Sequence, residues 1–290
     1  MSKVAQVTAQ AKINLLLRVL ARDVGGYHSI ETILLRLDLG DDVRVRVTAG
    51  RSLDCTGRAL PAGGLGPIEE NLAYRAAAAY ANATGWPKGF AIEIDKHIPV
   101  AAGLGGGSAD AGAVLRALDA LSPNPLGDRL LELATPLGAD VPFMTIESPM
   151  ALAWGRGERL LALPAPDARD VLLIVPDFGV SAKDAYAWLS ADRGDYLPET
   201  EVFDPNLFAG WDGLVRVARN DLEAPVVRRH PLIGEMVGGL RRACPLAMMS
   251  GSGSTVFGVF DETFGADAGG SGVTCIGTST SERVLPVITE

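Results

Sequence analysis

The chain has 290 residues, of which 48% are hydrophobic and 21% are charged, so it can bury a large core and matches about two ordinary domains in length. Lys and Arg number 26 against 35 Asp and Glu, and the formal net charge of −9 disfavours a nucleic acid as the main partner. A phosphate-bearing small molecule must therefore be bound by local groups such as backbone amides, a helix N-terminus or a few placed cations.

Cysteine spacing and hydropathy indicate where the protein works. Cys55, Cys244 and Cys275 are odd in number, far apart and free of a C-x-x-C spacing, which argues against a disulfide framework or a zinc site. Residues 13–17 resemble a short signal sequence, but Arg18 interrupts the apolar run, which is read as a strand. No run approaches the roughly 18 apolar residues of a membrane span. We expect a soluble, cytoplasmic protein with no membrane partner.

In the first half of the chain, the periodicity predicts strands and helices in alternation. Valines alternate with arginines over residues 43–47, which is the pattern of a strand with one buried face. A loop is expected over 50–67, an alanine-rich helix over 71–82 that ends at Gly85, and a strand over 90–95. The segment 99–110 then predicts the end of a strand, a glycine loop and the start of a helix that continues over 111–121.

The next segments are a helix over 128–137, a turn that contains Asp140, and a strand near 143–146. Residues 164–168, rich in proline, are the best candidate linker, and the apolar run 171–175 predicts a buried strand. Helices are expected over 182–189 and 231–242, and residues 247–260 predict two strands around a glycine-rich turn. The sequence thus predicts an α+β protein with an N-terminal domain over 1–163 and a C-terminal domain over 164–290.

The glycine loop is the strongest chemical feature. Four glycines lie within the five residues 103–107, where the absence of side chains lets backbone amides converge on an anion, and the following helix adds its N-terminal amides. No lysine follows these glycines, so the loop is not a Walker A motif. Asp119, the acidic residue nearest the required spacing, falls inside a predicted helix, which weakens a dinucleotide fingerprint. The loop therefore predicts a phosphate site of another class.

Ordered motifs along the chain resemble the GHMP kinase family. They occupy residues 11–15 (Ala-Lys-Ile-Asn-Leu), 26–28 (Gly-Tyr-His), 37–41 (Leu-Asp-Leu-Gly-Asp), 103–108 (Gly-Leu-Gly-Gly-Gly-Ser), 137–142 (Leu-Gly-Ala-Asp-Val-Pro), 220–223 (Asn-Asp-Leu-Glu) and 249–253 (Met-Ser-Gly-Ser-Gly). The resemblance covers nearly the whole chain. It implies the GHMP kinase fold, with an ATP-binding N-terminal domain like the second domain of ribosomal protein S5, a ferredoxin-like C-terminal domain, and the site in the cleft between them.

By the same resemblance, the chain is expected to transfer the γ-phosphoryl group of ATP, with Mg²⁺, to a hydroxyl of a small cytidine diphosphate compound. The resemblance makes Asp140 the base or hydroxyl-orienting group and Lys12 the cation that steadies Asp140 and the developing charge. Phosphoryl transfer depends on alignment and charge stabilisation, so one carboxylate and one cation at the acceptor suffice. Both groups must stay ionised, which their mutual attraction favours.

The resemblance also implies binding residues. The substrate would contact Asn14, Tyr27, His28 and Asp140, with Tyr27 and His28 at the cytidine part. The nucleotide would contact Asn71 and the loop residues Pro99, Val100, Ala101, Ala102, Gly103, Leu104, Gly105, Gly106, Gly107, Ser108 and Ala109. Ser108 is the expected hydroxyl at the phosphates or Mg²⁺. The Gly251–Ser254 turn either closes the site from the second domain or is an ordinary hairpin loop.

Two departures from the family pattern and two alternatives stay open. Gln10 stands where the first motif usually has proline, and Ala109 follows Ser108 where a second serine is common, so this chain offers one hydroxyl there. One alternative is a kinase of the same family with another acceptor, of the mevalonate or homoserine kinase type. The other is a nucleotide-binding regulator without turnover, against which the presence of both Lys12 and Asp140 argues.

Overall fold

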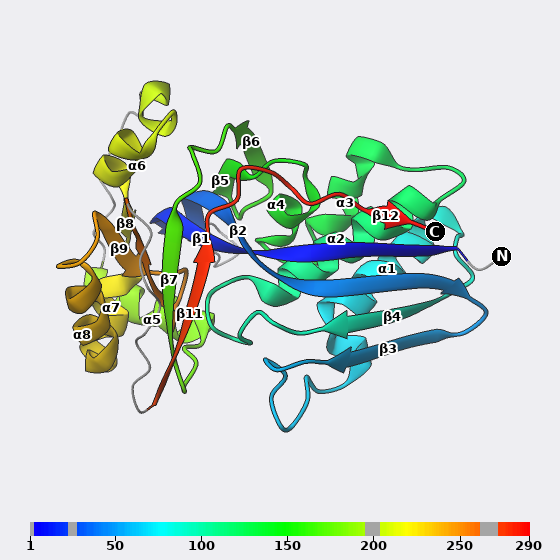
Figure 1. Cartoon of the computed structure of the whole chain (residues 1–290), viewed down its shortest axis with the longest axis horizontal. Coiled ribbons are helices and arrows are strands. Elements are labelled where there is room, and N and C mark those ends of the chain that lie inside the picture. The colour runs from blue at the N-terminus through cyan, green and yellow to red at the C-terminus, as the bar shows by residue number, and fades with distance from the viewer. Residues whose placement is uncertain (1–2, 23–27, 195–203, 262–271) are drawn as a thin grey trace.

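Two β-sheets of different size organise the chain (Figure 1). The computed structural model describes residues 3–22, 28–194, 204–261 and 272–290. The eight-stranded sheet has the order β12-β1-β2-β4-β3, with β5 and β8 also paired to β2 and β1, and β6 to β5. Its strands are β1 (Val4–Arg22), β2 (His28–Thr48), β3 (Arg51–Thr56), β4 (Gly89–Asp95), β5 (Met150–Gly155), β6 (Arg159–Leu163), β8 (Arg219–Asn220) and β12 (Ile288–Thr289).

The second sheet is antiparallel, with the order β11-β7-β10-β9. Its strands are β7 (Asp170–Pro176), β9 (Leu246–Met249), β10 (Val256–Val259) and β11 (Val273–Ser279). In Figure 1, β7 and β11 run across one end of the long strands β1 and β2. The predicted linker at 164–168 falls between β6 and β7, but β8 and β12 return to the first sheet. The boundary at residue 163 stays a prediction.

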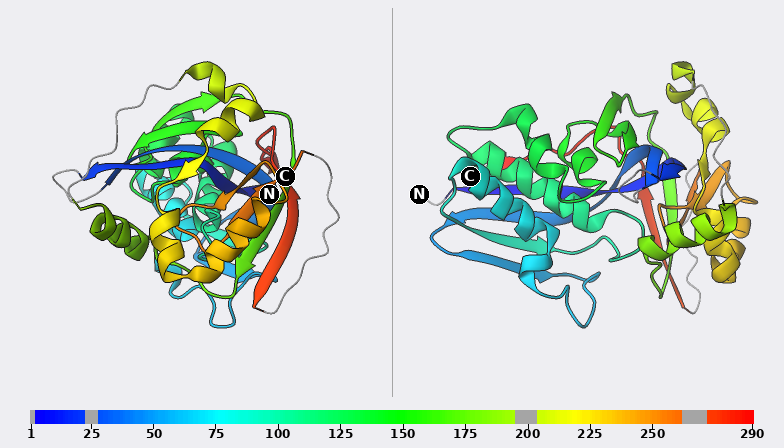
Figure 2. Two further views of the ribbon diagram at one scale, coloured as in Figure 1. Left: turned by 90° about the vertical axis from the view of Figure 1, so that its left-hand side faces the viewer. Right: turned by 180° about the vertical axis from the view of Figure 1, so that it is seen from behind.

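Helices cover both sheets. Behind the first sheet lie α1 (Leu72–Thr84), α2 (Gly106–Leu121), α3 (Leu130–Ala134) and α4 (Val141–Thr145), with short 3₁₀ segments at Ile68–Glu70 and Gly127–Arg129 (Figure 2). The second lobe carries α5 (Ala182–Arg193), α6 (Trp211–Val217), α7 (Glu223–Arg229), α8 (Pro231–Leu240) and the 3₁₀ segment Pro205–Phe208. Helix α2 is buried along most of its length, since alanines and leucines face the sheet and α1 and α4 cover its other sides.

Strands β1 and β2 enter two hydrophobic cores. Leu15 and Ile33 lie in the larger core with α1 and α2. Further along, Leu17, Val19 and Ile30 join a second core under α5, α7 and α8. The middle of β1 therefore lies where the two lobes meet, and this places residues 12–14 between them.

The predicted mixed α and β architecture is confirmed, with corrections. The strand expected at 143–146 is wrong: residues 143–145 belong to helix α4, and Ile146 is its C-cap. Pro142 occupies the first turn of α4, and all five of its side chains are buried. A run of apolar residues fits a buried helix as well as a buried strand, so periodicity could not separate the two. The loop expected over 50–67 contains β3, which pairs in parallel with β4. The helix expected over 128–137 is divided into a 3₁₀ turn and the short α3.

Two expectations drawn from composition can be compared with the structure. Cys55, Cys244 and Cys275 are all free thiols. Among the described residues, no helix has both the length and the apolar character needed to cross a membrane.

Candidate active site

The glycine loop connects the end of β4 to α2 and leaves its backbone open to a cavity. Gly103 and Gly105 have φ values of +80° and +74°, which only glycine adopts without strain. Gly105 caps α2, so the amides of the first turn of that helix face outward without an internal acceptor. A cavity of about 300 Å³ is lined by Asn71, Leu72, Lys96, Asp110 and loop residues that include Ser108. Amides and a helix N-terminus around this space suit a phosphate.

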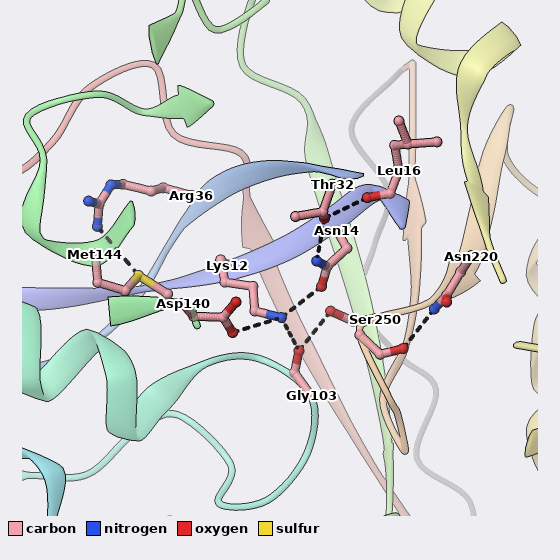
Figure 3. A network of polar contacts seen from close by, with 11 residues as sticks. Lys12, Asn14, Leu16, Thr32, Arg36, Gly103, Asp140, Met144, Asn220 and Ser250 are labelled. Atoms are coloured by element: carbon pink, nitrogen blue, oxygen red, sulfur yellow. Dashed lines mark hydrogen bonds and ion pairs between the residues drawn. The ribbon is translucent and has the colours of Figure 1, made fainter. Parts of the chain in front are cut away.

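Lys12 on β1 reaches the start of this loop. Its ammonium donates to Asn14 Oδ1 at 2.7 Å and to the carbonyl of Gly103 at 2.9 Å, and lies 3.6 Å from Asp140 Oδ2 (Figure 3). The side chain is 4% exposed. A Cβ at Gly105 would lie 3.0 Å from Lys12 Cγ, so the glycine at 105 leaves room for the lysine stem. Lys12 and Asp140, which are remote in sequence, therefore lie close together in the structure, as expected.

Asp140 occupies the N-cap position of α4, yet its side chain makes no capping hydrogen bond. The carboxylate is 30% exposed and faces Lys12. Since the helix does not use this carboxylate as a cap, its partly exposed oxygens stay available to a hydroxyl group.

Asn14 has both ends of its amide engaged. Its Oδ1 accepts from Lys12, and its Nδ2 donates to Thr32 Oγ1 at 2.8 Å, while Thr32 Oγ1 donates to the carbonyl of Leu16 at 2.6 Å. Asn14 is 3% exposed. The side chain therefore orients the ammonium of Lys12, and its expected contact with the acceptor stays a prediction.

The turn between β9 and β10 packs on the glycine loop from the second lobe. Ser250 Oγ donates to the carbonyl of Gly103 at 2.9 Å, and Thr255 N donates to that of Ala102 at 3.2 Å. Asn220 Nδ2 holds the turn through the carbonyls of Met249 and Gly251, at 2.8 and 2.7 Å. The Gly251–Ser254 turn is thus a hairpin connection and also a contact between the lobes (Figure 3).

His28 lies beside α5 of the second lobe. Its ring stacks on that of Tyr186, with centroids 5.4 Å apart and planes 23° apart, and its Nε2 lies 3.0 Å from Ser190 Oγ. Burial, with a smaller effect from the charge of Asp140, raises the pKa of Tyr186 to about 12. Tyr27, predicted with His28, lies outside the described residues.

The sequence reasoning did not assign Tyr186, because the segment before it matches the family pattern only loosely. The available signal was Ser181, whose side chain caps α5 three residues before Asp184. That cap predicts where the helix begins, but not which lobe Tyr186 faces.

A second group that the sequence reasoning missed lies beneath the loop. Lys96 Nζ contacts Asp41 Oδ2 at 2.5 Å and Asp110 Oδ2 at 2.7 Å, with side-chain exposures of 2%, 0% and 3%. Asp41 Oδ1 also accepts from the backbone amides of His97 and Ile98. Burial raises the pKa of Asp110 to about 7, against the attraction of Lys96, and Asp110 Oδ1 is buried without a hydrogen-bond partner. These contacts fix the strand end from which the loop departs.

The remaining predicted residues are placed as follows. Asn71 caps α1, with Oδ1 accepting from Ala73 N at 2.9 Å, and also lines the 300 Å³ cavity. Ser108 lies in the first turn of α2 and lines the same cavity, whereas Ala109 is buried behind it. Residues 99–102 separate this cavity from a second one of about 610 Å³ that is walled on its far side by β7 and β11. The contacts of these residues with a nucleotide stay predictions.

Comparisons with known proteins agree with this geometry. The family profile described as "GHMP kinases N terminal domain" matches residues 71–147, which contain the loop and Asp140. A 4-diphosphocytidyl-2-C-methyl-D-erythritol kinase of Desulfotalea psychrophila is 39% identical over 264 residues, covering 89% of this chain and 86% of the relative. The enzyme of the same name from Anaeromyxobacter dehalogenans is 42% identical over 261 residues, covering 87% of this chain and 79% of the relative.

Solved structures give the same result. A crystal structure of 4-(cytidine 5'-diphospho)-2C-methyl-D-erythritol kinase has a TM-score of 0.73 at 33% identity and covers 95% of this chain and 98% of that one. A homoserine kinase from Cytophaga hutchinsonii shares the fold alone, with a TM-score of 0.66 at 16% identity, and covers 99% and 97% of the two chains. The expected GHMP kinase fold is therefore confirmed, and the chain belongs to the 4-diphosphocytidyl-2-C-methyl-D-erythritol kinase family, a branch of the GHMP kinases.

Proposed function

We propose that this chain transfers the terminal phosphoryl group of ATP to the 2-hydroxyl of 4-diphosphocytidyl-2-C-methyl-D-erythritol, a step of the methylerythritol phosphate route to isoprenoid precursors. The observation that carries the proposal is the meeting of Lys12 and Asp140 beside the first carbonyl of the glycine loop. A cation and a carboxylate close together beside the loop support this proposal, because phosphoryl transfer depends on alignment and on stabilisation of charge.

In this mechanism, Asp140 Oδ accepts a hydrogen bond from the acceptor hydroxyl and orients its oxygen toward the γ-phosphorus. An oxygen–phosphorus bond forms as the bond between the γ-phosphorus and the bridging oxygen breaks, and ADP leaves. The hydroxyl proton passes to Asp140, which is 30% exposed and returns it to solvent. Lys12 neutralises charge on the transferring group, and Asn14 holds its ammonium in place.

The nucleotide would lie along the loop, with its phosphates on the amides of residues 103–108 and on the N-terminus of α2. Among the described residues, no cluster of three His, Cys, Asp or Glu side chains could hold a metal ion alone. Mg²⁺ takes phosphates and water as most of its ligands, and Ser108, which lines the cavity, would supply the protein's hydroxyl ligand. When bound, the ion would neutralise phosphate charge.

The cytidine part of the substrate would lie against His28 and Tyr186. Their stacked rings provide an aromatic surface with polar edges, which suits a pyrimidine base. This aromatic surface supports the cytidine diphosphate acceptor over mevalonate or homoserine, neither of which carries a base.

We also propose that the protein works in the cytoplasm, and the free thiols of Cys55, Cys244 and Cys275 support this location.

The test is ADP release with ATP and each of three candidate alcohols: the cytidine diphosphate compound, mevalonate and homoserine. We expect turnover on the first alone, with a new phosphomonoester at the tertiary carbon in the ³¹P and ¹³C spectra of the product. Turnover on mevalonate or homoserine alone would assign the chain another acceptor. ATP binding by calorimetry without transfer to any alcohol would make it a non-catalytic nucleotide-binding protein.

A further inference from the structure

Helix α4 carries Asp140 at its N-terminus but is too short to hold its own position. It has five residues, Val141–Thr145. Isolated helices below about 12 residues are marginal in water, so a single turn depends on tertiary contacts. What fixes the two ends of α4 therefore decides where the carboxylate of Asp140 lies.

The far end of α4 is held by a buried arginine on β2. Arg36 Nη2 donates to the carbonyls of Phe143 at 2.8 Å and Ile146 at 3.0 Å, and Nε donates to that of Ser148 at 3.1 Å. Its Nη1 lies 3.8 Å from Met144 Sδ, and the guanidinium carbon lies 4.8 Å from the ring centre of Phe143 (Figure 3). The side chain of Arg36 thus follows the last turn of α4, where carbonyls lack helical partners.

The burial of this charge is costly, which argues that it has a specific use. Arg36 is 2% exposed, and burial, followed by the charge of Arg116, lowers its pKa to about 9. Each contact above is to a carbonyl, a thioether or an aromatic ring. An apolar side chain of similar volume would avoid this desolvation cost but would leave three carbonyls without their donor. Such a side chain could not donate to three carbonyls of one segment, as the forked guanidinium of Arg36 does.

The position of Arg36 in the sheet relates it to Lys12. The two residues face each other directly across the β1–β2 ladder. Like charges at directly opposed positions are unfavourable in a sheet unless each has its own partner. Here the two side chains reach opposite ends of the same helix: Lys12 reaches the carboxylate before α4, and Arg36 reaches the carbonyls at its end.

The remaining side of α4 lies against α2. A Cβ at Gly112 would lie 2.6 Å from the backbone carbon of Met144, so the two helices are in close contact and α4 has no room to move that way. Helix α3 also contacts α4. At the C-terminal end of α4, the fork of Arg36 links the helix to β2.

We propose that Arg36 is a positioning residue for phosphoryl transfer. Arg36 holds the C-terminal end of α4 and Lys12 contacts Asp140 at the other end, so that the Asp140 carboxylate stays at the acceptor. The proposal rests on the proposed function insofar as Asp140 acts on the acceptor hydroxyl. In this proposal, Arg36 does not contact the substrate or the nucleotide.

The experiment compares Arg36→Met, Arg36→Lys and the control Arg116→Met. Arg116 is the matched control because it is also a buried arginine, 8% exposed, and lines a cavity beside the C-terminal end of α4, yet its side chain donates to the carbonyl of Leu285 at 2.7 Å and, among the described residues, to no carbonyl of α4. Both Met variants remove a buried guanidinium, so both are expected to lower the melting temperature. Only Arg36→Met is expected to lower kcat, by roughly 10- to 100-fold, with KM for ATP unchanged, because misplacement of a reacting group by about 1 Å has effects of this size.

Arg36→Lys, which keeps the charge but not the fork, should recover part of the rate and gives a folded variant if Arg36→Met does not fold. In a double-mutant cycle, the Arg36 substitution should lose most of its effect on kcat once Asp140 is Asn, because one residue acts through the other. Amide exchange over 140–146, which needs no substrate, should be faster in the Arg36 variants and unchanged in Arg116→Met.

Two results would overturn the proposal: a folded Arg36 variant with the kcat of the unsubstituted protein, or additive effects in the cycle. A failure of the proposed function is separately visible, since the unsubstituted protein would not turn over the cytidine diphosphate compound. The exchange experiment would still report whether Arg36 holds α4.

Discussion

Two lysine–aspartate clusters lie on either side of the glycine loop and differ in how completely they are satisfied. Lys96 contacts two carboxylates at 2.5 and 2.7 Å, and all three side chains are at most 3% exposed. Lys12 lies 3.6 Å from a single carboxylate that is 30% exposed. The first cluster is closed by short contacts inside the protein, and the second leaves the carboxylate of Asp140 partly exposed.

This difference in exposure indicates that the Lys96 cluster supports the fold, whereas the Lys12–Asp140 pair is suited to the reaction. A sealed triad fixes strand ends and helices, but its charges are used within the protein and are not free for a substrate. A loose pair at the cleft contributes little to stability, yet it can exchange contacts with an incoming alcohol and phosphate. We therefore expect substitutions in the two clusters to have opposite profiles, with loss of stability in one and loss of rate in the other.

The largest effect is expected for Lys96→Met. Removing the ammonium leaves Asp41 and Asp110 buried without their cation, and breaking a buried pair in this way costs about 3–5 kcal/mol of unfolding free energy. Lys12→Met should cost less, about 1–3 kcal/mol, because Asp140 can hydrate on its exposed side while the buried Asn14 Oδ1 loses its donor. Urea denaturation measures both. Equal losses of stability would erase the distinction between the clusters.

Asp140→Asn tests the open cluster. The amide keeps the shape of the side chain but cannot accept the hydroxyl proton, so kcat should fall by about a hundredfold or more, with nucleotide affinity nearly unchanged. Steady-state kinetics and calorimetry with ATP give the two quantities. Asp119→Asn is the control, since Asp119 accepts from Tyr80 and from Leu126 N away from the cleft and should keep its rate. Loss of ATP binding in Asp140→Asn would instead give Asp140 a role in the fold.

The sequence predicts those site residues that lie in short, recognisable motifs, and it does not predict those whose roles depend on partners elsewhere in the chain. The glycine loop, Lys12 and Asp140 lie in short motifs whose residue types indicate their chemistry, and these motifs resemble those of one family along nearly the whole chain. Lys96, Tyr186 and Arg36 carry no such local signal, because each acquires its role from partners on other elements, as Arg36 does from α4. Only the folded chain identifies those partners.

The errors in secondary structure have a similar cause. Helix α4 is a short run of apolar residues, and the pattern alone does not distinguish a buried turn of helix from a strand. β3 lies in a polar, glycine-rich region, and its pairing with β4 depends on tertiary contacts that its own sequence does not specify.

The closed cluster also makes a pH prediction. Because burial raises the pKa of Asp110 to about 7, the folded protein binds a proton between about pH 4 and 7 that the unfolded chain has released. The free energy of unfolding should fall as pH rises through this range, by up to about 1.4 kcal/mol per pH unit. The charged groups that face Asp110 are Asp41 and Lys96, with the Cys55 thiol nearby.

In Asp110→Asn, this dependence of stability on pH should be lost, which urea denaturation from pH 4 to 8 in EDTA without nucleotide would measure. The Asp140→Asn variant is the matched control, since its carboxylate belongs to the open cluster. An unchanged slope in Asp110→Asn would mean that the closed cluster does not hold the proton.

The smallest effect on kinetics is expected for Gly103→Ala, at the start of the glycine loop. Gly103 has φ +80°, and a Cβ there would lie 2.3 Å from the carbonyl oxygen of Ser250. Its own carbonyl accepts from both Lys12 and Ser250, so Gly103→Ala must displace the loop from the second lobe. We expect the clash to add to the loss of about 1–2 kcal/mol of stability that a left-handed residue costs, together with a several-fold rise in KM for ATP.

Gly127→Ala separates strain from contact. Gly127 also has a left-handed φ, +57°, but a Cβ there would have no heavy atom within 4 Å. Alanine at 127 should therefore show a loss of stability of about 1 kcal/mol from backbone strain alone, with unchanged kinetics. If the two variants gave the same KM for ATP, the contact between Gly103 and Ser250 would have no part in nucleotide binding, and the second lobe would act on the acceptor alone.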